Sequence, residues 1–380
     1  MKLNIKSNIF TDTTYKNFIN EIISRGFKRI VLIVDKKVSE FKYISKITSL
    51  LKKRLYIKNT FFFDETHEPT YEYLDENINF FRKKKKNLFD AIIVIGGGST
   101  MDFAKGCALL SKNFKPAISY MGFPKKIKDP IPVITIPSTT STGSEIIYNA
   151  VFTSKKMNKK LGINSEKNFP IMTFFDPKII ALAPKEIIIY SALATFNRAI
   201  ETYVFSKGNF ITKEISRQAF DLVRINLPKY LKTNNLDYLK KLQLAGSLSI
   251  IALSNSGGGA SGILNYYFST NFEVPQAKSF SVVSLEMLKF NMNNNFENYK
   301  NILHSKKLLD FKKIIKNIEI ILLSQKKKKS YPKLSLDLEK INYDLLNKLD
   351  LISSRNNIRL KQSDLKKLIK IITKKIDELK

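Results

Sequence analysis

Short, continuous apolar runs alternate with polar loops and helical patterns through the first half of the chain. Three of these runs, at residues 28–35, 90–95 and 132–137, are rich in β-branched side chains. Runs of this kind are typical of buried parallel strands. The repetition of strand, polar loop and helix predicts an α/β dinucleotide-binding domain with a parallel sheet over residues 1–180, with its ligands at the carboxyl ends of the strands.

The second half of the chain has a different periodicity. Apolar residues recur with a spacing of about 3.6 in long stretches, at residues 187–204, 211–231 and 239–253. This pattern predicts an all-helical C-terminal domain over residues 181–380. The glycine cluster Gly257-Gly258-Gly259 interrupts the helical pattern and predicts a break between two helices.

The length of 380 residues allows two ordinary domains that need no disulfide or structural metal. The single cysteine, Cys107, excludes a disulfide framework and a thiolate metal cage, as expected in a reducing compartment. Because the chain also lacks an apolar run long enough to span a bilayer, we expect a cytoplasmic protein without a membrane partner.

The formal net charge is +32, from 65 Lys and Arg against 33 Asp and Glu. A charge of this size can indicate a nucleic-acid partner. Here lysines are spread along the whole chain beside many Asn and Ile residues, and we see no basic stripe or aromatic stacking platform. We therefore predict no nucleic-acid partner, although the positive field favours small acidic substrates.

Three consecutive glycines, Gly96-Gly97-Gly98, follow the second apolar run and are followed by Ser99. Glycines at this position let the backbone approach a pyrophosphate, which then faces amide groups at the start of the next helix. Ser99 adds a hydroxyl donor, and Asp102 lies in the first turn of that helix. The alternative is a tight strand-to-helix turn without a ligand.

Two further segments complete the predicted cofactor site. Asp35 ends the first apolar run and is placed to accept hydrogen bonds from an adenosine ribose, which favours NAD(H) over NADP(H). Its alternative role is a helix N-cap. The segment 137–145 supplies many hydroxyl groups at a strand end, among them Thr139, Thr140 and Thr142.

The order and spacing of four motifs resemble the iron-containing (group III) alcohol dehydrogenase family. These motifs are GGGST with Asp102 and Lys105, IPSTTSTGSE, DPKIIALAPKE and AIETYV. The segment 255–276 resembles the phosphonoacetaldehyde reductase-like branch. The resemblance implies NAD(P)-dependent interconversion of an alcohol and an aldehyde, a divalent iron or zinc ion, and a tendency to form homodimers.

The metal ligands of that family are an Asp and a His four residues apart, followed by two later His residues. In this chain the four positions fall on Ala194, Arg198, Gly262 and Gln276. Alanine and glycine side chains cannot bind a metal, and arginine does not lose its proton to do so. The only two histidines, at 67 and 304, lie far from these positions in the sequence. We therefore predict that the metal site is degenerate.

A fixed cation could replace part of the role of the metal. We predict that Arg198, helped by Lys160, stabilises the oxyanion or an anionic group of the substrate. The alternative is that Arg198 only pairs with Glu201 or Glu145 and serves packing and charge balance.

These observations favour an oxidoreductase that acts on a small, anionic (phosphonate) aldehyde or alcohol. A second interpretation is a catalytically inactive protein of the same fold, which acts as a nucleotide-binding or interaction subunit. Loss of the metal ligands favours the second interpretation. Retention of the glycine loop and of Thr139 and Thr140 favours the enzyme, because a chain without a nucleotide has no need for them.

Overall fold

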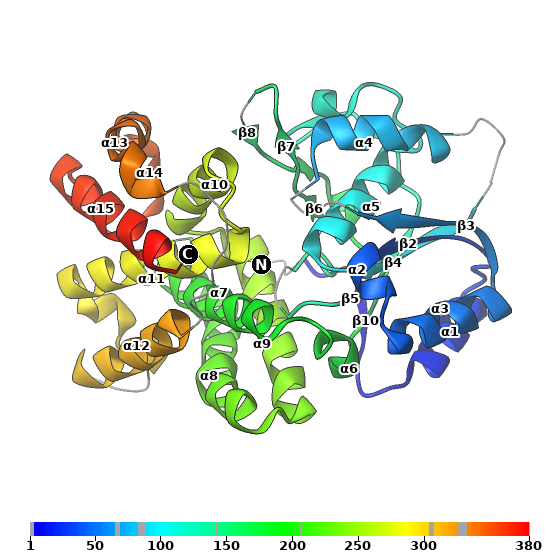
Figure 1. Cartoon of the computed structure of the whole chain (residues 1–380), viewed down its shortest axis with the longest axis horizontal. Helices are drawn as coiled ribbons and strands as arrows, with labels where there is room; N and C mark the ends of the chain where they lie inside the picture. Colours follow the sequence, from blue (N-terminus) through cyan, green and yellow to red (C-terminus); the bar gives the residue numbers. More distant parts are fainter. Residues whose placement is uncertain are drawn as a thin grey trace. The chain divides into compact units, whose positions relative to one another are not determined.

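The computed structural model describes residues 4–64, 69–82, 89–140, 143–157, 159–205, 207–303, 308–324 and 333–379. The chain divides into two compact units, Met1–Pro184 and Lys185–Lys380, which are described one after the other. In Figure 1 the N-terminal unit runs from blue to green and the helical unit from green to red.

The N-terminal unit is built on a parallel sheet. In the described part of the unit, six strands pair in the order β1-β10-β5-β4-β2-β3, and every pairing between neighbours is parallel. The bounds of these strands are β1 Asn8–Phe10, β2 Arg29–Asp35, β3 Tyr56–Phe63, β4 Ala91–Gly96, β5 Val133–Pro137 and β10 Met172–Phe174. The three strands predicted from the apolar runs are β2, β4 and β5, so these predictions are confirmed.

Helices cover both faces of this sheet, as Figure 1 shows. Alternate residues of β2 point to opposite sides because side chains alternate along a strand. Ile30 and Leu32 join one buried cluster, with α1 and α3, whereas Val31 and Ile33 join the other, with α4 and α5. The helices of the unit are α1 Tyr15–Ser24, α2 Lys36–Ser39, α3 Lys42–Arg54, α4 Tyr71–Asn77, α5 Gly98–Leu110 and α6 Pro177–Ile180.

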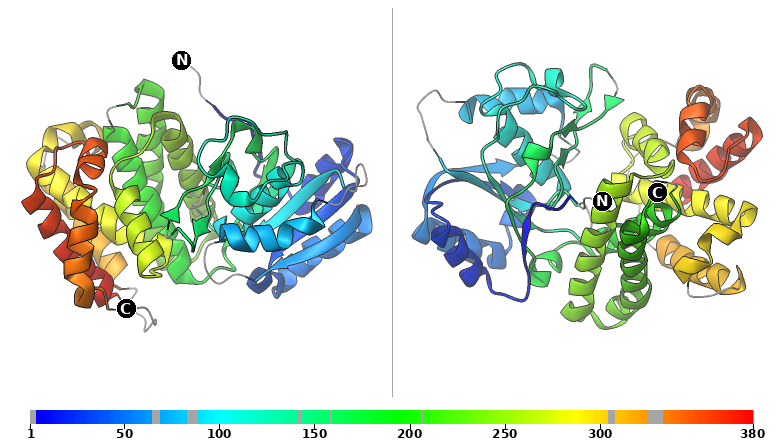
Figure 2. Two further views of the ribbon diagram at one scale, coloured as in Figure 1. Left: turned by 90° about the horizontal axis from the view of Figure 1, so that it is seen from above. Right: turned by 180° about the vertical axis from the view of Figure 1, so that it is seen from behind.

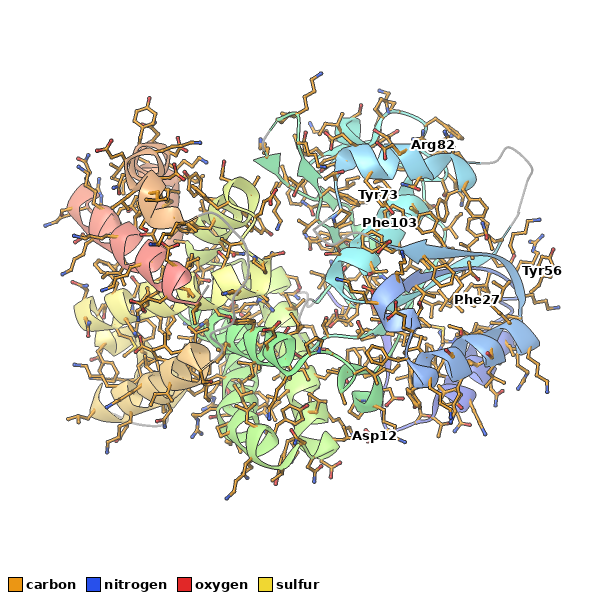
Figure 3. All side chains as sticks on the ribbon, viewed as in Figure 1. Asp12, Phe27, Tyr56, Tyr73, Arg82 and Phe103 are labelled. Carbon is orange, nitrogen blue, oxygen red and sulfur yellow. The ribbon has the colours of Figure 1, made fainter. Side chains whose placement is uncertain are left out.

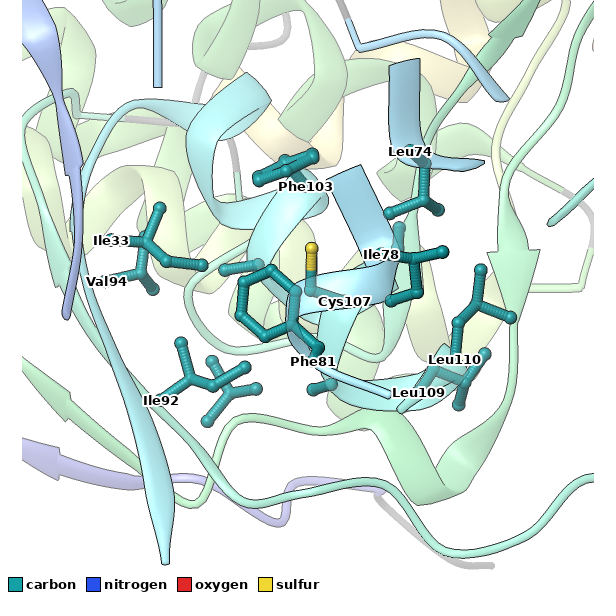
Figure 4. Close-up of a cluster of buried hydrophobic side chains, with 14 of the residues drawn as sticks. Ile33, Leu74, Ile78, Phe81, Ile92, Val94, Phe103, Cys107, Leu109 and Leu110 are labelled. Carbon is teal, nitrogen blue, oxygen red and sulfur yellow. The ribbon is translucent and has the colours of Figure 1, made fainter. Parts of the chain in front are cut away.

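Aromatic and aliphatic packing fixes the position of α5, whose first turn follows the glycine loop. The ring of Phe103 lies 5.2–5.3 Å from the rings of Phe61, Phe63 and Tyr73, and Figure 3 labels Phe103 and Tyr73. Cys107, one turn further along α5, lies in the buried cluster shown in Figure 4. Burial raises the pKa of its thiol, so it is a packing residue rather than a reactive thiolate.

Between β5 and β10 the chain forms two small antiparallel pairs, β6 with β9 and β7 with β8. Their bounds are β6 Asn149–Ala150, β7 Thr153–Ser154, β8 Lys159–Lys160 and β9 Ile163–Asn164. The repeating strand and helix pattern did not predict these pairs.

The described part of the second unit consists of helices, as predicted. Its α-helices are α7 Lys185–Val204, α8 Phe210–Thr233, α9 Leu236–Ser256, α10 Ser261–Asn271, α11 Gln276–Asn294, α12 Leu308–Leu323, α13 Leu338–Leu346, α14 Leu349–Arg355 and α15 Gln362–Glu378. Helix α7 packs against α8, α9 and α11, and Figure 2 shows these helices from two further directions. The glycine cluster ends α9, with Gly257 at φ +86°, so the predicted break is confirmed.

A charged cluster joins three helices of this unit. Lys289 on α11 contacts Glu286 at 3.1 Å and Glu319 on α12 at 2.6 Å. Lys375 on α15 contacts Glu286 at 2.7 Å and also pairs with Glu319. The cluster therefore links α11, α12 and α15 through shared carboxylates. In the part of the chain that the structure describes, no helix is long and apolar enough to cross a membrane.

Candidate functional site

The glycine loop lies where β4 ends and α5 begins. Gly96 is required by local packing, because a Cβ atom there would lie 2.7 Å from the side chain of Thr100. At Gly97 a Cβ atom would make an ordinary contact of 3.5 Å with Thr139. Packing within the described chain therefore does not require the second glycine, and its role towards a ligand stays a prediction.

Helix α5 begins without help from a side chain. Its N-cap, Gly97, has extended geometry (φ −84°, ψ −172°), and among the described residues no side chain caps the first turn. The first amide groups of a helix lack intrahelical partners, and the helix dipole adds a partial positive charge there. Gly98 and Ser99, the first two residues of α5, thus present amide groups suited to a phosphate.

The threonine-rich segment lies beside this loop. Gly96 is in register with Pro137 of β5, and the amide of Ser138 donates to the carbonyl of Gly96 at 2.8 Å. Thr139 and Thr140 follow directly. The Oγ1 atoms of both are buried and have no hydrogen-bond partner among the described residues.

Buried polar atoms usually have partners, so these two adjacent hydroxyl groups are available to donate to a ligand. The donor groups fit the phosphate, ribose and amide groups of a dinucleotide. Thr142, the third predicted threonine, lies outside the described residues.

Asp35 lies near the same edge of the sheet, where Val34 of β2 is in register with Ile95 of β4. Its carboxylate caps the short helix α2 by accepting from the amide of Val38 at 3.2 Å. It also accepts from the hydroxyl of Thr100 at 3.2 Å. The alternative role as a helix cap is thus present in the structure, and the contact with a ribose stays a prediction.

Asp102 belongs to a buried polar network that joins α5 to the segment after β5. Lys105, which is 0% exposed, lies 3.3 Å from Asp102 and donates to the carbonyl of Asn149, while Ser144 donates to Asp102. Burial raises the pKa of Asp102, against the opposing effects of Lys105, Ser144 and the amide of Val151. Burial likewise lowers the pKa of Lys105, against Asp102 and Glu145.

Asp102 is the fifth residue of α5, so the prediction that it lies in the first turn is wrong, because the helix begins at Gly98. The network holds the second turn of α5 against the segment that follows β5. Asp102 thus has partners within the protein, and its direct contact with a cofactor stays a prediction. The supporting roles of Thr100, Lys105 and Ser144 were not predicted from the sequence. These three residues stand in the same polar motifs as the glycines and threonines, and that position in the sequence could have pointed to their roles.

The two predicted cationic residues lie in different units. Lys160 is buried in the N-terminal unit, on β8, where it is in register with Thr153 of β7. Arg198 lies on α7 of the helical unit. Its Nη1 donates to the hydroxyl of Ser249 on α9 at 3.2 Å, and its guanidinium lies 5.7 Å from the ring centre of Phe280 on α11.

The charge of Arg198 also affects the pKa of Glu201, which lies one turn further along α7. Burial raises the pKa of Glu201, while the hydrogen bonds from Ser261 and the charge of Arg198 act to lower it. A packing and charge-balancing role of Arg198 is thus visible in the structure. Its role towards a substrate stays a prediction.

The positions that the resemblance assigns to the metal ligands lie on α7, α10 and α11, and the loss of the metal stays a prediction. Ala194 and Arg198 lie one turn apart on α7, Gly262 is the second residue of α10, and Gln276 is the first residue of α11. A Cβ atom on Gly262 would meet no atom within 4 Å. Among the described residues no group of three or more His, Cys, Asp or Glu side chains could hold a metal. His67 and His304 lie outside the described residues.

Comparison with known proteins assigns the chain to a family. Residues 6–177 match the model of the iron-containing alcohol dehydrogenases, and residues 188–374 match that of the C-terminal domain of the Fe-containing alcohol dehydrogenase family. The chain belongs to the iron-containing alcohol dehydrogenase family. It is therefore an alcohol dehydrogenase-like oxidoreductase, and the resemblance seen in the sequence motifs is confirmed.

Individual relatives of this alcohol dehydrogenase-like chain are distant. Alcohol dehydrogenase 4 of Schizosaccharomyces pombe is 25% identical over 289 residues, which cover 75% of this chain and 67% of that protein. NAD-dependent methanol dehydrogenase of Bacillus methanolicus is 28% identical over 193 residues, which cover 50% of each protein.

Among solved structures, sulfoacetaldehyde reductase of Bifidobacterium kashiwanohense in complex with NAD⁺ superposes with a TM-score of 0.82 at 19% identity. That match covers 98% of both chains. It shows that the two proteins share a fold. The phosphonoacetaldehyde reductase-like branch stays a prediction for this member of the iron-containing alcohol dehydrogenase family.

Proposed function

We propose that the chain binds NAD(H) in preference to NADP(H) and interconverts a small anionic aldehyde, such as a phosphonate aldehyde, with its alcohol without a catalytic metal. The observation that carries the proposal is a contrast between two sets of residues, one in each unit. The nucleotide side keeps buried hydroxyl groups without partners at Thr139 and Thr140. At the positions that the resemblance assigns to the metal ligands, Ala194, Arg198 and Gly262 cannot bind a divalent ion, which leaves the amide of Gln276 alone.

The proposed nucleotide contacts follow from the loop geometry. The amides of Gly97, Gly98 and Ser99 receive the pyrophosphate at the N-terminus of α5, and Thr139, Thr140 and Thr142 donate to nearby polar groups. Asp35 and Asp102 are the proposed acidic contacts. A nicotinamide ring bound here supplies a hydride to the substrate carbonyl or accepts one from the alcohol.

During reduction, negative charge develops on the carbonyl oxygen. In this proposal the guanidinium of Arg198 stabilises that charge or binds the anionic group of the substrate, and Lys160 assists. Ser249 and Phe280 hold Arg198 in place, which favours a fixed orientation of its charge. The solved relative named for sulfoacetaldehyde, itself an anionic aldehyde, supports the substrate class.

A second candidate function is a nucleotide-binding protein without turnover. The contacts of Arg198 with Ser249 and Phe280 favour it, because they give this residue a structural role. Fluorescence titration with NADH and NADPH, followed by a panel of neutral and anionic aldehydes, separates the two candidates. Tight NADH binding with reduction of anionic aldehydes supports the enzyme, and binding without turnover of any aldehyde supports the second candidate.

We predict that Arg198→Ala lowers kcat for an anionic aldehyde about 100-fold, because a preorganised charge near the oxyanion is lost. Lys160→Ala should lower kcat less, and Lys159→Ala, on the exposed neighbour in β8, serves as the matched control. Rates for Arg198→Ala equal to those of the parent would eliminate the cationic role. Elemental analysis accompanies the assay, and a stoichiometric metal ion would contradict catalysis without metal.

A further inference from the structure

An exposed ion pair joins the carboxyl ends of β2 and β3, beside the residue proposed to contact the adenosine ribose. The strand order places β2 between β4, which leads into the glycine loop, and β3. Asp35, the last residue of β2, is in register with Phe63, the last residue of β3. One residue further along each strand, the ammonium of Lys36 contacts a carboxylate oxygen of Asp64 at 2.5 Å. The parallel register therefore brings these two charges together.

Lys36 directly follows the residue that is proposed to contact the ribose. In dinucleotide-binding folds an acid near the ribose accepts a hydrogen bond from its 2′-hydroxyl group, whereas a basic residue near the ribose accommodates the 2′-phosphate of NADP(H). This chain carries both kinds of group, because Asp35 is followed by Lys36 and Lys37. Asp35 alone therefore does not set the preference between the two cofactors, and the surroundings of Lys36 matter as well.

The ammonium of Lys36 is engaged by a neighbouring acid. The hydrogen bond to Asp64 and the charge of Asp64 raise the pKa of Lys36, and the charge of Glu40 acts in the same direction. A 2′-phosphate held near Asp35 would also meet the carboxylate of Asp64. Like charges repel each other, so this carboxylate disfavours a phosphate in two ways: it occupies the nearest cation and it adds its own negative charge.

We propose that the ion pair of Lys36 and Asp64 is a determinant of the preference for NAD(H). Asp64 holds Lys36 and cancels the charge that would otherwise receive the 2′-phosphate of NADP(H). NAD(H) carries a hydroxyl group at that place, so it neither needs Lys36 nor is repelled by Asp64. This inference rests on the proposed function, because it requires a nicotinamide dinucleotide at the glycine loop. Asp64 is a positioning residue and takes no part in hydride transfer.

Fluorescence titration of the parent and of Asp64→Asn with NADH and NADPH, at neutral pH and low salt, tests the proposal. The variant frees Lys36 and removes one negative charge. We expect it to bind NADPH about threefold to fivefold more tightly than the parent does, with NADH affinity unchanged. The side chains of Lys36 and Asp64 are 55% and 51% exposed, so the substitution should not impair folding. Unchanged NADH binding checks this directly.

Asp129→Asn is the matched control. Asp129 forms an exposed ion pair with Lys167 at 2.9 Å and precedes the amino end of β5, whereas the glycine loop lies at a carboxyl end. Its substitution changes the net charge by the same amount and should leave the ratio of the two affinities as in the parent. An equal gain in NADPH affinity from Asp129→Asn would overturn the proposal in favour of a general effect of charge.

A second substitution tests whether Asp64 acts through its lysine partner. Adding Lys36→Met to Asp64→Asn should remove most of the gain in NADPH affinity, whereas adding Lys37→Met should leave it. A gain that survives the loss of Lys36 would show that repulsion by Asp64 acts alone, which overturns the role of the ion pair.

The same titrations separate this inference from the proposed function. Binding of neither cofactor by the parent, or tighter binding of NADPH than of NADH, would overturn the proposed function and this inference with it. Preferential NADH binding by the parent, with the same ratio of affinities in Asp64→Asn, would overturn this inference alone.

Discussion

At the scale of single residues, the buried hydroxyl of Thr140 is the sharpest probe of the nucleotide site. This residue is 1% exposed, and its Oγ1 has no partner among the described residues. We predict that Thr140→Val weakens NADH binding about fivefold, because one hydrogen bond contributes about 1 kcal/mol. The free energy of unfolding of the free protein should stay unchanged or rise. Fluorescence titration and urea unfolding measure the two effects.

Thr135 offers a matched control on the preceding strand. Its hydroxyl is also buried, but it is satisfied within the protein by the carbonyl of Glu145 at 3.1 Å and the hydroxyl of Thr173 at 2.9 Å. Thr135→Val should therefore lower the free energy of unfolding and leave NADH affinity unchanged. The same response from both variants would contradict a ligand role for Thr140.

Residue types and positions at the strand ends could be predicted from the sequence, but their partners could not. A carboxylate at the end of an apolar run can cap a helix or bind a ribose, and both roles use the same residue type. Only the coordinates place Val38 and Thr100 against Asp35. The same holds for Arg198, whose partners Ser249 and Phe280 lie on helices far along the chain from it.

At the scale of elements, the charged cluster joining α11, α12 and α15 depends on Glu319. Burial alone would raise the pKa of Glu319, but hydrogen bonds and charges from Lys289 and Lys375 outweigh it, so the pKa is lowered. We predict that Glu319→Gln lowers the free energy of unfolding by about 2 kcal/mol near pH 7. Urea unfolding of the full chain measures this loss.

The sign of its pH dependence follows from the lowered pKa. A carboxyl group with a lower pKa in the folded state stabilises the protein above its unfolded pKa of about 4.3. This stabilisation is lost as the pH falls through the pKa that Glu319 has in the folded state. The difference between Glu319→Gln and the parent should therefore shrink as the pH falls below the unfolded pKa of about 4.3. A difference that grows on acidification would show that the pKa of Glu319 is raised instead.

Long elements could be predicted from periodicity, and short ones could not. Strands β2, β4 and β5 and helices α7, α8 and α9 each contain enough apolar residues to show their period. Strands β6 to β9 have two residues each, too few to show an alternation. Each of these strands pairs with a partner strand that the intervening loop brings alongside it, as with Asn149 and Asn164.

At the scale of the whole molecule, the net charge of +32 should oppose folding. Like charges repel each other more in a compact chain than in an unfolded one, and salt screens this repulsion. We predict that the free energy of unfolding rises by on the order of 1 kcal/mol between low and moderate concentrations of tetramethylammonium chloride. Urea unfolding at each concentration tests this. A fall with salt would show that ion pairs outweigh the repulsion.

The order of strands in the parallel sheet constrains the folding of the chain during synthesis. Strand β1 pairs with β10, so Asn8 is in register with Met172. During synthesis β1 is therefore made long before β10, the strand it pairs with, while β2, β3 and β4 can already pair with one another. Residues near position 8 remain without their strand partner until β10 has been synthesised. A chaperone that binds emerging apolar segments would find them exposed there.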